Sequence, residues 1–409
     1  MSVDEKLVQM ELDAKFDVAD DNVEMEARMP DPSLFKDIKS KKTPPKVPKM
    51  FLSNDCIFNC AYCACRNSLD EKDRYCNNPR DMAVMAVNEA KANKSGVFLT
   101  SAICKSPNNT QEMINEAIKI MRDELQYAGY IHAKIMPGVD PFLIRQAGLY
   151  ANRLSVNIEV AKSEGYTKIA KQKNKSNILL PMGYISGYIK EEAERRNKYG
   201  WKFASSQTTQ LMAGSTDEDD RTIITLSNAL YKKYDLKRVY YTPFQYKNKA
   251  RGYELPFVST PHWRMRRLYQ ADRLLQLYNF TPDEITPEQS PFLEYDIDPK
   301  AAWALRNLHI FPIEVNTAEF EMLLRIPGIG LTYANKIIRA RSHFKITHEV
   351  LRKMGISLKK SVYFITCDGK YEGGKNFDNP AIRQHVTDIT LEKDSDQLTA
   401  FGCGSGLIC

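Results

Sequence analysis

Short apolar, β-branched runs recur along the first 250 residues of the chain, separated by longer amphipathic segments. Runs of this length predict buried strands, because about four to eight apolar residues suit a strand better than a helix. The expected strands are 49–54, 96–101, 130–137, 153–160, 202–214 and 238–244.

Between these runs, apolar residues recur at helical spacing. The expected helices are 82–93, 110–127, 141–150, helical material up to 197, and 217–234. Six such β/α units predict parallel strands with helical crossovers. Periodicity alone does not distinguish an open doubly wound sheet from a barrel. The glycine fingerprints of dinucleotide- and phosphate-binding loops are missing after the first strand.

Beyond residue 250 the pattern predicts helices only, at 261–280, 298–307, 316–344 and 347–364. Before the first strand, an acidic segment is followed by the Lys/Pro stretch "KDIKSKKTPPKVPK". The predicted organisation is an acidic N-terminal segment with its linker (1–45), a β/α region (46–250), a helical connector packed on it (251–312), a small helical module (313–366) and a flexible tail (367–409).

Composition is that of a globular protein: 409 residues, 43% hydrophobic and 27% charged. We expect a cytoplasmic protein, since the sequence holds neither a membrane-length apolar run nor a basic start followed by an apolar block. The net charge of +7 is unevenly distributed. Residues 321–365 carry nine Lys and Arg against Glu321 and Glu349, which favours a polyanionic partner, although a solvated helical face is the simpler alternative.

Four of the nine cysteines lie in "CIFNCAYCACR", directly after the first predicted strand. In a reducing compartment such a cluster indicates metal or redox chemistry. Cys56, Cys60 and Cys63 have the spacing to bind three irons of a [4Fe-4S] cluster and leave the fourth iron open. A structural zinc site would need four ligands, usually from a second cysteine pair, and no such pair follows. We interpret Cys65 as a non-ligand.

The loop resembles the signature of the radical S-adenosylmethionine (SAM) superfamily, in which an aromatic residue precedes the third cysteine, as Tyr62 does here. The resemblance implies a partial (β/α)6 barrel, a [4Fe-4S] cluster, SAM as the second cofactor, and a one-electron donor such as a flavodoxin or ferredoxin. It also implies reductive cleavage of SAM to a 5′-deoxyadenosyl radical that abstracts hydrogen from a substrate.

Residues at the carboxyl ends of the strands are then candidates for contacts with SAM. The second strand ends on Thr100, Ser101 and Ala102, where the superfamily has a Gly-Gly-Glu-like segment that this chain lacks. Period-two alternation places Ser155, Asn157 and Glu159 on one face; an interior polar network is the alternative for Ser155. The candidate SAM contacts are Tyr62, Thr100, Ser101, Ser155, Asn157, Glu159, Gln207 and Gln210.

Three further side chains near the predicted site have competing interpretations. Cys104, after the second strand, is a candidate hydrogen donor or thiyl carrier, although a buried structural cysteine is the favoured interpretation. His132 and Lys134 share one face of the third strand, where a core histidine is the expected state of His132.

The segment "LLRIPGIGLTYANKIIRAR" resembles the helix-hairpin-helix motif of DNA-processing proteins. Its glycines permit a sharp turn whose amides meet a phosphate at the next helix. The alternative is a plain helical hairpin, and "LRKMGISLKK" resembles a second, degenerate copy. The candidate nucleic-acid contacts are Gly328, Ile329, Gly330, Lys336, Arg339 and Arg341.

Together with "GYIHAKIMPG", "TTQLMAG" and "RLYQADRLL", these motifs resemble the DNA modification/repair radical SAM family over residues 48–367. The resemblance implies modification or repair of a DNA base or sugar. Two alternatives stay open: modification of structured RNA such as transfer RNA, and a non-catalytic iron–sulfur protein that binds nucleic acid. The helix with Trp263, Arg264, Arg266, Arg267 and Tyr269 either stacks on bases or, as the preferred interpretation, packs its aromatic side chains on the barrel and leaves its arginines in solvent.

Overall fold

The computed structural model describes residues 47–68, 73–199, 203–244 and 259–387. The predicted acidic segment and its linker, 1–45, therefore lie outside the described residues. The described chain divides into two compact units. Residues up to 218 and 226–261 belong to the first unit, and residues 219–225 and those from 262 belong to the second.

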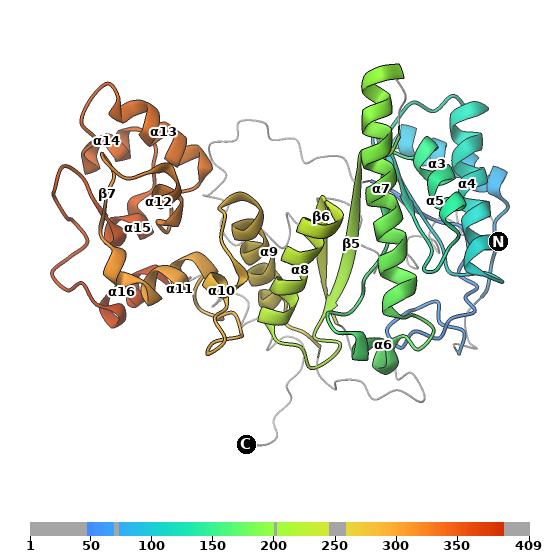
Figure 1. Ribbon diagram of the computed structural model, residues 1–409, viewed down its shortest axis with the longest axis horizontal. Coiled ribbons are helices and arrows are strands. Elements are labelled where there is room, and N and C mark those ends of the chain that lie inside the picture. The colour runs from blue at the N-terminus through green and yellow to red at the C-terminus, as the bar shows by residue number, and fades with distance from the viewer. Residues whose placement is uncertain (1–46, 69–72, 200–202, 245–258, 388–409) are drawn as a thin grey trace. The chain divides into compact units, whose positions relative to one another are not determined.

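The first unit contains one six-stranded parallel sheet (Figure 1). The predicted strands are confirmed in number and order. Their bounds are β1 Lys49–Phe51, β2 Val97–Thr100, β3 Ile131–Lys134, β4 Arg153–Ser155, β5 Ser206–Ala213 and β6 Arg238–Pro243. Strands pair in chain order from β1 to β6, so β1 and β6 form the two edges.

Helices connect these strands and pack side by side. They are α3 Pro79–Ala92, α4 Pro107–Asp123, α5 Pro141–Tyr150, α6 Ser163–Ile169, α7 Lys175–Tyr199 and α8 Asp220–Tyr234. Contacts link α3 with α4, α4 with α5, and α5 with α7, as Figure 1 also shows. A doubly wound sheet reverses its strand order at a switch point and divides its helices between two faces. Here the strands pair in chain order from β1 to β6, which makes an open partial barrel. The structure therefore decides between the two architectures that the periodicity left open.

Several helices begin at a capping residue followed by proline. Asn78 and Ser106 accept hydrogen bonds from backbone N–H groups three residues on, and Pro79 and Pro107 occupy the first helical position. The helices α3 and α4 therefore begin three residues before the expected 82 and 110. The apolar periodicity locates the buried face of a helix, whereas the cap determines where the backbone enters it.

The second unit is mostly helical. Its helices are α9 His262–Leu277, α10 Pro282–Ile285, α11 Pro299–Arg306, α12 Phe320–Arg325, α13 Leu331–Arg341, α14 His348–Lys353, α15 Leu358–Ser361 and α16 Asn379–Val386, with 3-10 turns at Leu308–Ile310 and Val362–Phe364. The expectation of helices only was wrong, because β7 Ile313–Glu314 pairs in parallel with β8 Ile365–Thr366. Strands of two residues are too short to show a period. The helix α9, expected in a separate connector, belongs to this unit.

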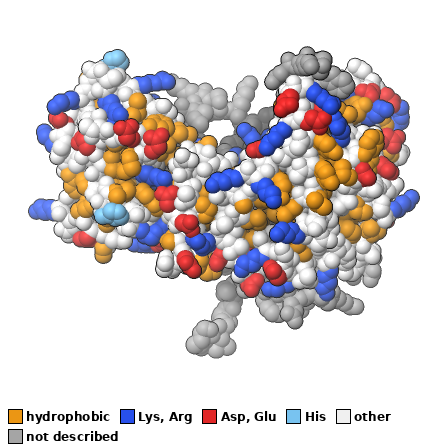
Figure 2. Space-filling model, viewed as in Figure 1, with side chains coloured by type: hydrophobic (Ala, Val, Ile, Leu, Met, Phe, Trp, Pro, Cys, Tyr) orange, Lys and Arg blue, Asp and Glu red, His pale blue; other side chains and the backbone are white. Residues whose placement is uncertain are grey.

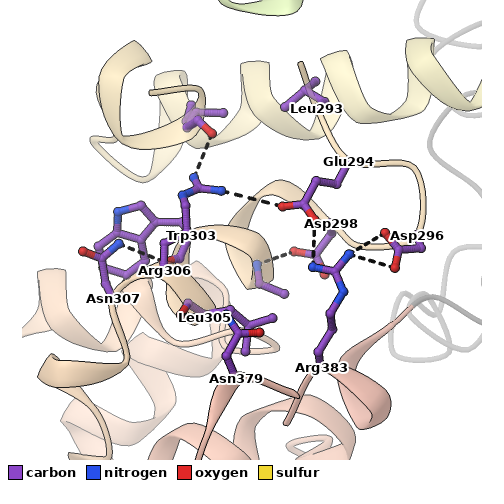
Figure 3. Close-up of polar contacts among 12 residues, drawn as sticks. Leu293, Glu294, Asp296, Asp298, Trp303, Leu305, Arg306, Asn307, Asn379 and Arg383 are labelled. Atoms are coloured by element: carbon purple, nitrogen blue, oxygen red, sulfur yellow. Dashed lines mark hydrogen bonds and ion pairs between the residues drawn. The ribbon is translucent and has the colours of Figure 1, made fainter. Parts of the chain in front are cut away.

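Residues 367–387, expected in the flexible tail, are built into the second unit. The helix α16 buries Ile382 and Val386, and Asp378 caps its start by accepting from the Ala381 N–H. Arg383 lies 2.7 and 2.8 Å from the two carboxylate oxygens of Asp296 and 2.7 Å from Glu294. Figure 3 shows its guanidinium pointing toward both carboxylates. The remainder of the predicted tail, 388–409, lies outside the described residues.

Within the described ranges, no helix is both long enough and apolar enough to cross a membrane.

Candidate functional site

A cavity of about 220 Å³ opens at the carboxyl ends of the barrel strands. All three cysteines of the predicted cluster line it, together with Tyr62, Cys65 and Arg66 of the same loop. Strand ends and the residues that follow them supply the opposite walls, among them Phe51, Thr100, Lys134, Asn157, Gln210 and Pro243. The parallel order places these ends on one side of the sheet, so residues far apart in sequence meet there.

Backbone hydrogen bonds fix the cysteine loop to its neighbours. The Ile57 N–H donates to the Ile103 carbonyl, and the Ala61 N–H donates to the Ile169 carbonyl, both at 2.8 Å. From the other side, Arg74 donates to the carbonyls of Asn54 and Cys65 through one nitrogen and to that of Arg66 through the other. The three thiols are thus held at the cavity by contacts with distant parts of the barrel.

The three thiols differ in environment. Burial raises the pKa of Cys60 to about 12 and also raises that of Cys56. A hydrogen bond from the Cys65 side chain is the main cause of a Cys63 pKa lowered to about 7. The Cys65 N–H also donates to Cys63 Sγ at 3.3 Å. Cys65 therefore contacts the third predicted ligand, Cys63, through both its backbone N–H and its side chain.

The donor set fits an iron–sulfur cluster. Cys56, Cys60 and Cys63 are free thiols on one loop, and all line the cavity. In the described part of the chain, no three His, Cys, Asp or Glu side chains converge as around a single metal ion. In a four-iron cluster each thiolate binds a different iron, so the three cysteines need not converge on one point.

A buried ion pair, which sequence reasoning missed, lies beside the cysteines. Lys173 Nζ lies 2.8 Å from Glu159 Oε1 and 3.2 Å from the Tyr62 hydroxyl. Burial opposes the charge on Lys173, but attraction by Glu159 and then Cys60 outweighs it, so the lysine pKa is raised. Lys173 lies in the polar run "KQKNK", where no apolar period marks one lysine as buried.

Glu159 adopts a backbone conformation unusual for a non-glycine residue, with φ of 62°. Its N–H donates to Gln210 O at 2.9 Å, and its carbonyl accepts from Met212 N–H at 2.8 Å, so β5 holds it in place. Its second carboxylate oxygen, Oε2, is buried and has no hydrogen-bond partner among the described residues. An acceptor is therefore left for a ligand in the cavity.

The other predicted SAM contacts divide into two groups. Thr100, Ser101, Asn157 and Gln210 line the cavity, and Asn157 Oδ1 accepts from Lys134 Nζ at 2.6 Å. Ser155 is buried but does not line the cavity. The strand β4 ends at Ser155, so the period-two alternation does not extend to Glu159.

Gln207 was predicted to contact SAM, but the structure places it outside the cavity lining. Its Nε2 donates to the carbonyls of Met182 at 3.1 Å and Tyr234 at 2.7 Å, which places the side chain among the helices. Gln207 and Gln210 are three residues apart on β5, and an odd separation places side chains on opposite faces of a strand. Only Gln210 therefore faces the cavity.

Cys104 and His132 lie outside the cavity lining. The Cys104 thiol is buried, and its sulfur lies 4.0 Å from that of Cys76. His132 is a core residue whose ring packs against Phe98 at 4.4 Å between centroids. The structure thus places Cys104 as a buried cysteine, the favoured interpretation, and the thiyl role has no contact with the cavity to support it.

Several solved structures are similar to this chain, all at low sequence identity. No protein-family model and no curated protein matches the chain. The FeFe-hydrogenase maturase HydG from Carboxydothermus hydrogenoformans is similar over 56% of this chain and 51% of its own, at 17% identity and a TM-score of 0.41. Methylornithine synthase (PylB) is similar over 56% of this chain and 60% of its own, at 14% identity and a TM-score of 0.41.

A third solved structure, the cobalamin-dependent S-adenosylmethionine radical enzyme OxsB, is similar over 86% of this chain and 55% of its own, at 10% identity and a TM-score of 0.33. The chain thus spans between 51% and 60% of the length of these three proteins. TM-scores of this size do not establish a shared fold. The partial-barrel architecture therefore rests on the order of the strands in this chain's own sheet.

In the second unit, the "PGIG" segment forms the turn between α12 and α13. Gly328 is exposed with φ of 85°, a region that favours glycine, whereas Ile329 is 1% exposed. The buried Lys300 donates to the Ile329 carbonyl. A second turn, with Gly355 at φ of 76°, lies between α14 and α15.

The three predicted basic contacts on α13 separate in the structure. Lys336 and Arg339 are exposed and line a shallow groove with His343 and Met354. Arg341 instead donates to the carbonyls of Val315, at 3.2 Å, and Ala318. Its guanidinium therefore holds the chain before α12, and the predicted phosphate contact by Arg341 is not supported by its placement.

Acids from outside the basic run offset much of its charge. Ion pairs join Arg325 to Glu284, Lys345 to Asp368, Arg352 to Glu372 and Lys360 to Asp298. On the face of this unit visible in Figure 2, basic side chains are interspersed with acidic and apolar ones. The net charge counted over 321–365 thus overstates the positive field.

The aromatic and basic helix α9 is also engaged within the second unit. Arg267 is 1% exposed and donates to the carbonyls of Glu294 and Tyr295. Arg264 pairs with Asp220 at 2.7 Å, and Trp263 packs edge-on against Tyr295. These contacts argue against a base-stacking surface, but they also correct the preferred interpretation, because they lie within the second unit and Arg267 is buried rather than solvated.

Proposed function

We propose that the chain is a radical SAM enzyme in which Cys56, Cys60 and Cys63 hold a [4Fe-4S] cluster and the adjoining cavity holds SAM. One observation carries the proposal: three free thiols of a single loop line a cavity that the strand ends of a six-stranded partial barrel enclose. When bound, the cluster supplies the electron that cleaves SAM to methionine and a 5′-deoxyadenosyl radical.

The residues around the thiols match the groups that SAM carries. Lys173 offers an ammonium to the carboxylate of SAM, and the unpartnered Oε2 of Glu159 offers an acceptor to its ammonium or its ribose hydroxyls. Asn157 and Gln210 add amides on the facing wall, and the Tyr62 side chain flanks the thiols. Apolar residues such as Met136, Val156 and Met212 limit the access of water.

For the substrate we propose nucleic acid, with DNA modification or repair favoured and structured RNA as the alternative. Support comes from the two glycine turns of the second unit and from the groove of Lys336, Arg339 and His343. Contacts of this kind bind the phosphate backbone without reading sequence, so affinity should fall with salt. A flavodoxin or ferredoxin is proposed as the electron donor.

Anaerobic reconstitution with iron and sulfide tests the enzymatic proposal. With SAM and a reductant, the protein should form 5′-deoxyadenosine, and addition of SAM should change the cluster spectrum. An unchanged spectrum together with no deoxyadenosine would favour the non-catalytic iron–sulfur protein instead.

Substrate class is tested by comparing turnover with single-stranded DNA, duplex DNA and folded RNA. DNA should accelerate deoxyadenosine formation and acquire a mass change. Equal rates with and without every nucleic acid would remove the nucleic-acid proposal and leave the radical SAM proposal intact.

A further inference from the structure

Two cysteines outside the proposed ligand set lie next to each other in the first unit. Cys76 Sγ lies 4.0 Å from Cys104 Sγ, although the two residues are 28 positions apart in sequence. Neither residue lines the cavity. The pair therefore needs an interpretation of its own, apart from the binding of the [4Fe-4S] cluster and SAM.

The two thiols differ in their access to solvent. Cys76 is exposed, whereas Cys104 is 7% exposed. Burial raises the pKa of Cys104 to about 11, which keeps that thiol protonated at neutral pH and shielded from reagents in solution. A reagent therefore meets Cys76 first, and Cys104 is placed to react with the group that forms on Cys76.

Backbone contacts hold both cysteines in place. An antiparallel bridge joins Cys76 to Ser53. The Cys104 N–H donates to Thr110 Oγ1 at 2.9 Å, and the Thr110 hydroxyl donates to the Cys104 carbonyl at 2.9 Å. Because both backbones are held, the remaining approach to the S–S bonding distance of about 2 Å falls to the side chains.

The entrance to the cysteine loop, residues 53–57, lies between the two segments that carry this pair. On one side, the Ile57 N–H donates to the Ile103 carbonyl at 2.8 Å. On the other side, the Asn54 N–H donates to the Tyr75 carbonyl at 3.3 Å. A bond between the two sulfurs would link these two sides across the loop entrance.

We propose that Cys76 and Cys104 form a redox-active dithiol that closes reversibly to a disulfide and fixes the entrance of the cysteine loop. The oxidant is a small-molecule disulfide. The Cys76 thiolate attacks one sulfur of this molecule, which breaks its S–S bond, forms a mixed disulfide and releases one thiolate. Cys104 then attacks the Cys76 sulfur and releases the second thiol. The protons of the dithiol pass to the released thiols, and its two electrons reduce the small disulfide.

Peptide mapping of the reconstituted protein in anaerobic glutathione redox buffers tests the dithiol. Trypsin yields one peptide with Cys76, residues 75–80, and one with Cys104, residues 95–105, so the disulfide appears as their cross-link. Because the second step is intramolecular, the cross-link should exceed the mixed disulfide at Cys76 by about tenfold or more. Excess reduced glutathione should reopen it.

Three variants sharpen the test. Cys104→Ser should stop at the mixed disulfide on Cys76, and Cys76→Ser should leave the buried Cys104 unmodified. The control Cys367→Ser removes a buried cysteine of the second unit and should leave the cross-link unchanged. In the oxidised wild-type protein, hydrogen exchange of a peptide over 53–57 should slow by about tenfold or more, since a cross-link limits local opening.

The proposal would be overturned by the absence of a cross-link between the two peptides at every glutathione ratio. A mixed disulfide at Cys104 in Cys76→Ser, as abundant as that at Cys76 in Cys104→Ser, would also contradict it. So would hydrogen exchange over 53–57 that oxidation leaves unchanged. Because the mapping requires no turnover, a protein that forms the cross-link but never cleaves SAM would contradict the enzymatic proposal and not the dithiol.

Discussion

Lys173 Nζ lies 2.8 Å from Glu159 Oε1 beside the three cysteines of the loop, and the side chains of Lys173 and Glu159 are 12% and 4% exposed. A buried ion pair is costly to break from one side, because the remaining charge stays unpaired in a poorly solvated place. This pair therefore makes the site sensitive to single substitutions that preserve its shape.

Lys173→Met should destabilise the first unit by about 3 kcal/mol or more, whereas Lys173→Met combined with Glu159→Gln should recover much of the loss. Urea unfolding and hydrogen exchange of peptides from β4 and β5 measure both. The control is Lys168→Met, which breaks the exposed pair with Asp217 and should cost less than about 1 kcal/mol. Equal losses in the single and double variants would show that the two charges are not coupled.

Serine substitutions separate cluster ligands from neighbouring cysteines. Cys56→Ser, Cys60→Ser and Cys63→Ser should each lose most of the iron bound after reconstitution, since each removes one thiolate ligand. Cys104→Ser and Cys76→Ser should retain it, because Cys104 lies outside the cavity lining and Cys76 is exposed. Cys65→Ser should retain iron with an altered absorption spectrum. Loss of iron from Cys65→Ser equal to that from Cys63→Ser would make Cys65 a ligand.

Lys300 should make the free energy of unfolding of the second unit rise as the pH increases above about 7. Burial lowers the pKa of its ammonium from 10.5 to about 7. Between these two values the unfolded chain binds a proton that the folded chain does not, so the free energy of unfolding rises with pH, by up to about 1.4 kcal/mol per unit. At pH below about 7 both states are protonated and this dependence ends.

Urea unfolding followed by tryptophan fluorescence tests the dependence, because Trp263 and Trp303 both lie in the second unit. Lys300→Met should abolish the rise in stability above pH 7. Lys359→Met, at an exposed position, serves as the matched control and should retain it. A slope unchanged in Lys300→Met would assign the dependence to another group.

The basic residues of α13 should divide into binding and structural roles. Lys336→Ala and Arg339→Ala should each weaken oligonucleotide binding and reduce its salt dependence by about one counterion. Arg341→Ala should instead destabilise the second unit by about 1–3 kcal/mol, since it leaves the carbonyls of Val315 and Ala318 without their donor. A reduced salt slope in Arg341→Ala without loss of stability would reverse these assignments.

Local sequence was sufficient to predict the strands of the barrel and the position of its cysteine loop. Strand and helix types follow from short-range periodicity, so all six strands of the first unit were found in order. The spacing of Cys56, Cys60 and Cys63 lies within eight residues, and all three side chains line the cavity. Helix starts were less accurate, because caps such as Asn78 act outside the apolar pattern.

Tertiary structure decided which polar groups face the cavity. Lys173 and Arg66 are more than one hundred residues apart, and only the parallel strand order brings both to one cavity. Gln207 and Gln210 look alike in sequence, yet the pleat of β5 turns one toward the helices and the other toward the site. The charge of 321–365 could be counted from the sequence, but its partners Glu284, Asp298, Asp368 and Glu372 come from segments that only folding brings near, because ion pairs depend on distance in space.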